Sequence, residues 1–248
     1  MTILEGKNLY KRYRRREIRV DALSDVSFAL NQGEILGVVG ESGSGKSTLL
    51  RLLSGLERAD KGEFLLDGKP LPPQRTKEQY RSIQMIFQDA VGSFQPRRRI
   101  AVSIRDAVKS LCGRDAEPDM ASLCAMVGLS PALAERYPRE LSGGQCQRFA
   151  IARAVAASPR VLLCDEITSA LDVSTQAQVL QLLAEICREK HMAALLVSHD
   201  LSVVSCLCSR VMVLYQGALV EEGPVRRVID APEQEYTKRL LDSVLEVR

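Results

Sequence analysis

Short and almost wholly apolar runs recur along the chain, separated by polar segments. Three of them, residues 35–39, 161–164 and 193–197, consist mainly of Ala, Val, Leu and Ile. Runs of this length and composition are typical of strands buried on both faces of a parallel sheet. Residues 26–30 instead alternate apolar with small or polar side chains, which indicates a half-buried strand. The pattern therefore predicts an α/β protein.

Helical periodicity fills much of the sequence between these runs. One helix is expected after the first run, with an apolar side made of Leu49, Leu50, Leu52, Leu53 and Leu56. Another is expected over residues 173–189, and residues 234–245 have the pattern of an amphipathic helix. Gln216-Gly217 lies between two apolar stretches, residues 211–215 and 219–221, which predicts a hairpin. From residue 89 to residue 157 the pattern is helical, which indicates a helical subdomain inserted into the α/β core.

Composition narrows the class of protein. The chain has 248 residues, of which 46% are hydrophobic and 26% charged, as in globular proteins. Its net charge of +3 does not favour a nucleic-acid partner. We expect no membrane-spanning segment, because no apolar run approaches the roughly 18 residues that cross a bilayer. The N-terminus also lacks a secretory signal pattern. Basic residues cluster at 11–16 and 97–99, where a solvated surface is the simplest interpretation.

A glycine-rich loop follows the first apolar run. Residues 40–47 read GESGSGKS and fit the phosphate-loop pattern, with a predicted strand before and a predicted helix after. Backbone N–H groups of such a loop converge on phosphate oxygens, and the helix start adds its positive dipole end. Lys46 is expected to reach the β- and γ-phosphates of ATP, and the Ser47 hydroxyl to hold Mg²⁺. The expected ATP-binding residues here are Gly40, Ser42, Gly43, Ser44, Gly45, Lys46, Ser47 and Thr48.

Two adjacent carboxylates end the second apolar run. Asp165 and Glu166 come directly after residues 161–164, at the strand end where open α/β sheets bind ligands. Asp165 can hold Mg²⁺, and Glu166 can act as the general base for an attacking water. Together with the phosphate loop, this pair predicts hydrolysis of a nucleoside triphosphate.

Residues 141–145 read LSGGQ and open a predicted helix, which forms a second anion-binding site. This pentapeptide resembles the signature of ATP-binding-cassette (ABC) ATPases, and the resemblance extends from about residue 4 to residue 245. It implies an ABC ATPase fold: a P-loop NTPase core with an antiparallel β subdomain and an inserted helical subdomain. The whole chain, 1–248, is then one ABC ATPase domain. Residues 1–88 and 158–248 form its core, and residues 89–157 form the helical subdomain.

The resemblance also implies roles for single residues. Tyr13 matches the aromatic that stacks on adenine, with Tyr10 as its competitor, and Gln88 matches the glutamine that touches Mg²⁺ and the attacking water. His199 matches the histidine that contacts the γ-phosphate. Two chains are expected to pair head to tail, so that ATP closes the pair and hydrolysis reopens it. The residues that would reach a partner's ATP are Ser142, Gly143, Gly144, Gln145 and Asp172.

Three further stretches resemble one importer group. Residues 88–97, 137–140 and 231–241 are similar to segments of the oligopeptide, dipeptide and nickel importer ATPases, with departures at Ala90, Phe94 and Gln95. The resemblance implies a second, different ATPase subunit, two transmembrane permease subunits and an extracytoplasmic binding protein. It places the chain at the cytoplasmic face of the membrane, with residues 89–99 facing the permeases. Peptide, nickel and metal-chelate cargo all remain open.

Other classes of ABC protein share these sequence patterns. The ATPase of an exporter or a lipoprotein-release system is the main alternative, against which the importer-like stretches count. A soluble ABC protein acting on DNA or ribosomes is a remote one, since such proteins carry tandem cassettes or long coiled-coil insertions. A binding-only regulatory cassette is disfavoured because Glu166 and His199 are both present.

Overall fold

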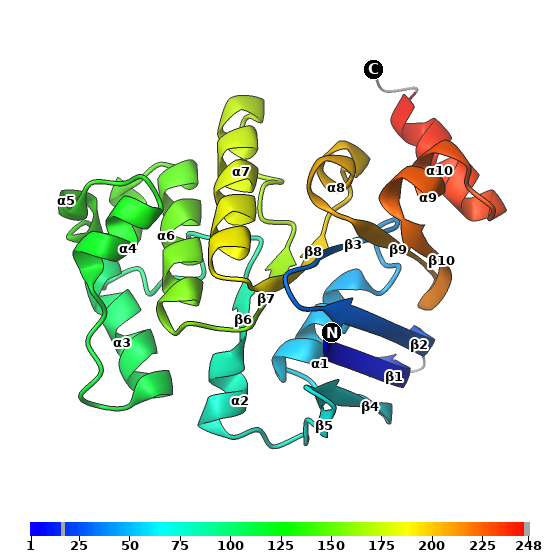
Figure 1. Cartoon of the computed structure of the whole chain (residues 1–248), viewed down its shortest axis with the longest axis horizontal. Coiled ribbons are helices and arrows are strands. Elements are labelled where there is room, and N and C mark those ends of the chain that lie inside the picture. The colour runs from blue at the N-terminus through cyan, green and yellow to red at the C-terminus, as the bar shows by residue number, and fades with distance from the viewer. Residues whose placement is uncertain (16–17, 246–248) are drawn as a thin grey trace. The chain divides into compact units, whose positions relative to one another are not determined.

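The computed structural model in Figure 1 describes residues 1–15 and 18–245. It forms two compact units, one made of residues 1–75 and 193–248 and the other of residues 76–192. Arg16, part of the first basic cluster, lies outside the described residues. No helix within the described part of the chain is both long enough and apolar enough to cross a membrane.

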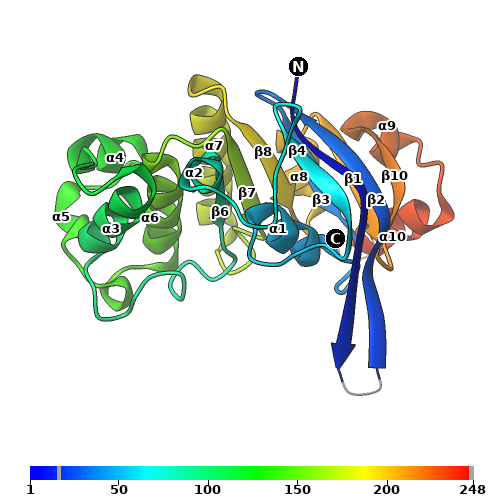
Figure 2. The same cartoon turned by 90° about the horizontal axis from the view of Figure 1, so that it is seen from below.

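The first unit contains an antiparallel sheet with the strand order β2-β1-β4-β5. Its two long strands, β1 (Thr2–Arg15) and β2 (Ile18–Asn31), form a hairpin that extends well past β4 (Lys61–Leu66), as Figure 2 shows. β1 pairs with β4 only as far as Tyr10, opposite Lys61, so among the described residues no third strand pairs with the outer part of the hairpin. The short β5 (Lys69–Pro70) completes the sheet.

Parallel strands form the centre of the same unit. β3 (Ile35–Val39) lies between β8 (Ala193–Val197) and β9 (Arg210–Tyr215) and is parallel to both. β10 (Ala218–Pro224) pairs antiparallel with β9, which gives the order β10-β9-β3-β8 within this unit. The buried parallel strands and the hairpin predicted from the sequence are confirmed.

The described residues of this unit include four helices. They are α1 (Lys46–Ser54), α8 (Leu201–Leu207), α9 (Val225–Asp230) and α10 (Glu235–Leu245). The four leucines expected on α1 from residue 49 to residue 53 are buried, but the prediction for Leu56 was wrong, because it is 61% exposed. The helix stops before Leu56 because Gly55 adopts a left-handed conformation and its N–H closes on the carbonyl of Leu52.

In the second unit, a parallel strand pair is accompanied by helices. β6 (Ile83–Ile86) pairs with β7 (Val161–Asp165), and α2 (Lys77–Ser82) precedes β6. The long α7 (Val173–Glu189) has the bounds that its periodicity predicted. The strand predicted at residues 161–164 is also confirmed.

The chain between β6 and β7 is helical. It contains α3 (Ile100–Cys112), α4 (Met120–Met126), α5 (Pro131–Ala134), a short 3₁₀ turn (Pro138–Glu140) and α6 (Gly143–Ala156). Helix α6 is the centre of this group and contacts α3, α4 and α7. Most of its side chains are buried, which explains why its sequence shows little amphipathic contrast.

Candidate nucleotide-binding and hydrolysis site

The phosphate loop connects β3 to α1 in the first unit. The apolar run of β3 ends at Val39, and the helix begins at Lys46, so residues 40–45 form the loop. Two glycines are required by its path. Gly40 has a φ of 146°, and a Cβ atom there would lie 2.1 Å from the backbone oxygen of Leu214. Gly45 has a φ of 108°, and a Cβ atom there would lie 2.4 Å from the backbone oxygen of Ala22.

Lys46 lies inside this loop. Its side chain is buried, with 5% of the residue exposed, and its Nζ donates to the carbonyl oxygens of Gly40 at 2.7 Å and Glu41 at 2.8 Å. The ammonium is thus held by main-chain acceptors at the start of α1, where the helix dipole favours anions. This arrangement is suited to binding phosphate groups.

Strand register places His199 beside the phosphate loop. Val38 of β3 is paired with Val197 of β8, and the two strands are parallel. Gly40 and His199 each lie two residues beyond this pair of residues, so both lie at the same edge of the sheet. His199 is exposed, and its neighbours Ser198 and Asp200 are tied into the turn, where Asp200 caps α8 through Ser202 N–H at 2.8 Å.

The same register argument applies to the carboxylate pair in the second unit. Ile86 of β6 is opposite Cys164 of β7, so Gln88 and Glu166 each follow two residues later. Their side chains meet, since Gln88 Nε2 donates to Glu166 Oε2 at 3.1 Å and to Ser169 Oγ at 3.2 Å. Ser169 Oγ in turn donates to the Glu166 carbonyl oxygen at 3.1 Å. The structure thus brings together two of the residues expected to handle the attacking water.

Glu166 also has an unusual backbone conformation. Its φ of 44° lies in the left-handed region, which side chains other than Gly and Asn occupy at a cost. Asp165 directly precedes it as the last residue of β7. The strand end therefore carries two adjacent carboxylates, the second of which has a left-handed backbone conformation.

The predicted signature forms the start of α6. Ser142 Oγ accepts from Gln145 N–H at 3.3 Å, and Gln145 Oε1 accepts from Ser142 N–H at 3.0 Å, so the two residues cap the helix reciprocally. Ser142 and Gly143 are exposed, and Gly144 and Gln145 are half-buried. The four residues therefore present the start of a 14-residue helix at the surface.

Arg153 links the signature helix to the segment after Gln88. Its guanidinium donates to the Ser93 carbonyl at 2.7 Å and to Ser93 Oγ at 3.0 Å, and lies 4.3 Å from the centre of the Phe94 ring. Burial lowers the pKa of Arg153. Sequence reasoning missed this residue, because a lone Arg within a helix carries no signal of its partner.

Asp172 is the N-cap of α7. Its carboxylate accepts from Ser174 Oγ at 2.6 Å, Thr175 N–H at 2.9 Å and Thr175 Oγ1 at 2.7 Å. These hydrogen bonds, that from the Ser174 hydroxyl contributing most, lower the pKa of Asp172 well below its usual range. Within this chain, Asp172 therefore caps the first turn of α7.

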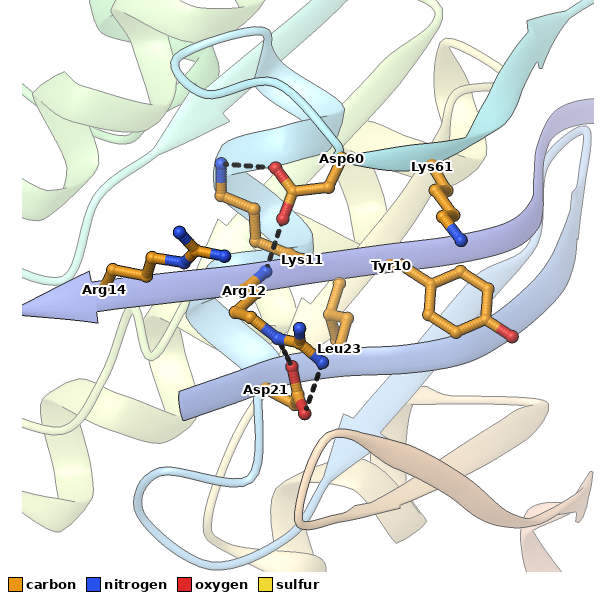
Figure 3. Close-up of a pocket in the computed structure, with 8 residues that line it drawn as sticks. All are labelled: Tyr10, Lys11, Arg12, Arg14, Asp21, Leu23, Asp60 and Lys61. Carbon is orange, nitrogen blue, oxygen red and sulfur yellow. Dashed lines mark hydrogen bonds and ion pairs between the residues drawn. The ribbon is translucent and has the colours of Figure 1, made fainter. Parts of the chain in front are cut away.

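Tyr13 and Tyr10 lie in different surroundings on β1. The Tyr13 hydroxyl donates to the Glu57 carboxylate and also receives a hydrogen bond from Thr48 of α1, two residues after Lys46. Burial raises the pKa of Tyr13, and Glu57 adds to that rise. Tyr10 instead lines an open pocket of about 600 Å³ on the sheet, together with Arg12, Arg14 and Lys61 (Figure 3).

Comparisons with known proteins agree with this geometry. The family model described as "ABC transporter" matches residues 23–169. The oligopeptide transport ATP-binding protein OppF of Haemophilus influenzae is 45% identical over 230 residues, which cover 90% of this chain and 69% of that protein. The chain belongs to the ABC transporter family.

The resemblance to importer ATPases stated from the sequence is confirmed by OppF and by a second relative. The glutathione import ATP-binding protein GsiA of Pectobacterium atrosepticum is 43% identical over 98% of this chain. The chain spans 41% of GsiA.

The ABC ATPase fold is confirmed by solved structures. The post-hydrolysis dimer of the ATP-binding cassette MJ0796, bound to ADP and Pi, has a TM-score of 0.80 at 30% identity and covers 90% of this ABC chain. The matched region covers 99% of the MJ0796 chain. The chain is therefore an ABC-type ATPase of the class whose members couple ATP hydrolysis to transport.

Proposed function

We propose that this ABC chain hydrolyses ATP to power the import of peptides, with oligopeptides as the cargo class. The hydrogen bond from Gln88 to Glu166 carries the proposal of hydrolysis, because it orients a carboxylate at a strand end where it can take a proton from water. The names of OppF and GsiA support a peptide cargo, since glutathione is itself a small peptide. Nickel and metal-chelate cargo have no such support.

The chain's own residues have separate tasks in this proposal. The loop amides and the ammonium of Lys46 bind the phosphates, and His199 contacts the γ-phosphate from the neighbouring strand end. Gln88 holds the attacking water, and Glu166 accepts its proton. The donors Ser47, Gln88 and Asp165 fit Mg²⁺, because hydroxyl, amide and carboxylate oxygens are the hard ligands that this ion prefers. When bound, the ion neutralises phosphate charge.

We propose that the signature and Asp172 act on the ATP of a partner subunit. The exposed start of α6 offers N–H groups and a positive helix end to an anion that comes from outside the chain. Support comes from the dimeric state named for the MJ0796 cassette. Two ATP molecules between two such subunits would close the dimer, and hydrolysis would reopen it.

The proposed partners are a second ATPase subunit, two transmembrane permease subunits and an extracytoplasmic binding protein, with the chain at the cytoplasmic face of the membrane. Residues 89–157 would form the helical subdomain, and residues 89–99 would meet the permeases. Of the arginines at 97–99, Arg98 pairs with Asp106, and Arg99 pairs with Glu135 at 3.0 Å. Arg97 is exposed and is the residue best suited to an external contact.

Co-purification tests the assembly. The chain would carry an affinity tag and be extracted from its native membranes in mild detergent, and its companions would be identified by mass. We expect a second, different ATPase, two permease subunits and, on addition of cargo, a binding protein. Recovery of the tagged chain alone, or with exporter-type membrane subunits, would contradict the importer proposal.

Substitution of the two tyrosines tests which of them binds adenine. Tyr13 is the candidate because its hydroxyl is hydrogen-bonded to Thr48 of α1, whereas Tyr10 lines the open pocket on the sheet. Since stacking on a base is worth about 1–3 kcal/mol, Tyr13→Ala is expected to weaken ATP binding by about 5- to 150-fold. Tyr10→Ala is the matched control and should bind ATP as the unsubstituted chain does. The reverse ranking in a titration with fluorescent ATP analogue would assign adenine to Tyr10.

A further inference from the structure

The C-terminal helix reaches the phosphate loop through one side chain. Tyr236, the second residue of α10, is only 6% exposed. Its hydroxyl accepts a hydrogen bond of 3.0 Å from the backbone N–H of Glu41, the second residue of the loop. The two residues are 195 positions apart in the chain but belong to the same compact unit. None of the roles proposed above uses this contact.

The ring of Tyr236 is held in place from the other side. It packs against the ring of Tyr215, with the ring centres 4.0 Å apart and the planes inclined by 32°. Tyr215 is the last residue of β9, and the turn after it also supports the loop, since Gly217 N–H donates to the Ser44 carbonyl oxygen at 3.0 Å. The side of the loop that faces β9 and α10 is therefore fixed at two points.

The segment that leads into α10 is anchored independently. Glu221 of β10 is 6% exposed, and its carboxylate accepts from the backbone N–H groups of Glu233 at 3.0 Å and Gln234 at 3.2 Å. A carboxylate that receives two main-chain N–H groups defines where the helix starts. The start of α10, and with it Tyr236, is thus held to the sheet by contacts other than the one with the loop.

Tyr236 and Lys46 hold opposite ends of the same peptide group. The Gly40 carbonyl accepts from Lys46 Nζ at 2.7 Å, and the N–H of that peptide, on Glu41, donates to Tyr236. Gly40 has no side chain to restrict rotation of this peptide, and its φ of 146° is outside the range of other residues. Rotation would turn the carbonyl away from Lys46 and remove one of the acceptors that hold the ammonium in the loop.

We propose that Tyr236 is a positioning residue of the ATP site, which acts through the Gly40–Glu41 peptide to keep Lys46 directed at the phosphate site. The hydroxyl fixes the peptide before ATP arrives, so that binding does not have to order it. Because the hydrogen bond of Tyr236 goes to the phosphate loop, we expect this residue to affect ATP affinity and not the chemical step. This inference rests on the proposed ATP site, but not on the proposed cargo or partners.

The test compares two substitutions that make the same chemical change in the same ring pair. Tyr236→Phe removes the hydroxyl that receives Glu41 N–H and keeps the ring. Tyr215→Phe is the matched control, because the Tyr215 hydroxyl contacts Gln216 at 3.2 Å and not the loop. For each full-length chain, the dissociation constant of a fluorescent ATP analogue, KM and kcat for ATP hydrolysis, and the melting temperature without nucleotide would be measured.

Loss of one hydrogen bond to the main chain predicts a dissociation constant and a KM that are about three- to tenfold higher in Tyr236→Phe, with kcat within about twofold of the unsubstituted value. Tyr215→Phe should leave all three unchanged, and the two variants should melt at similar temperatures. Equal affinities in the two variants would overturn the inference, as would a lower kcat or a lower melting temperature of Tyr236→Phe at unchanged affinity. An unsubstituted chain that binds ATP but transports nothing would contradict the proposed function alone.

Discussion

Replacement of Glu166 by glutamine is expected to lower the rate of ATP hydrolysis by about 100- to 10,000-fold, the range attributed to a positioned general base. Glutamine has nearly the same size and can still accept the hydrogen bond that Gln88 Nε2 now gives to Glu166 Oε2. It cannot take up a proton from water. ATP binding should therefore persist while phosphate release slows by this factor, as measured by a phosphate-release assay beside a nucleotide titration.

The control for this substitution is Glu189→Gln, at the exposed end of α7. This substitution also removes one negative charge, but at a position far along the chain from Glu166. The Glu189→Gln variant should therefore hydrolyse ATP at the unsubstituted rate. Hydrolysis at that rate by Glu166→Gln would show that the carboxylate is not the base. Loss of ATP binding in Glu166→Gln would instead assign the carboxylate to nucleotide binding.

Replacement of Lys46 by methionine is expected to weaken ATP binding by about 10- to 100-fold, since a hydrogen bond to a charged group is worth about 1.5–3 kcal/mol. Methionine keeps most of the volume of the buried stem but removes the ammonium that now bonds to the Gly40 and Glu41 carbonyls. Equilibrium titration with ATP measures the effect. Lys69→Met, on the exposed strand β5, is the matched control. A dissociation constant of Lys46→Met within twofold of the control would contradict the role assigned to this residue.

Some of the fold follows directly from the sequence because its physical cause is local. Strands β3, β7 and β8 are buried on both faces, so each appears as an apolar run that ends where the site begins. The phosphate loop is equally local, since its glycines and its lysine lie within eight consecutive positions. The register of parallel strands then brings Gln88 to Glu166 without any further sequence signal.

Other parts could not be predicted, because their cause lies in distant contacts. β1 carries a run of Lys, Arg and Tyr that hides its alternation, and its pairing with β2 becomes clear only in three dimensions. Leu56 continues the apolar sequence of α1 but lies past the glycine that ends the helix. The contact of Tyr236 with Glu41 depends on where α10 lies relative to the sheet. The contact of Arg153 with Ser93 depends on where α6 lies relative to the segment after β6. Single residues of this kind give no periodicity and no spacing to recognise.

Uptake of a labelled oligopeptide tests the central claim most directly. The complex that co-purifies with this chain would be reconstituted into vesicles with the binding protein on the side opposite the ATPases, and uptake would be measured with and without ATP. The account predicts ATP-dependent accumulation toward the ATPase side with the unsubstituted chain and none with Glu166→Gln. Accumulation that is equal in the two complexes, or movement of peptide away from the ATPase side, would contradict it.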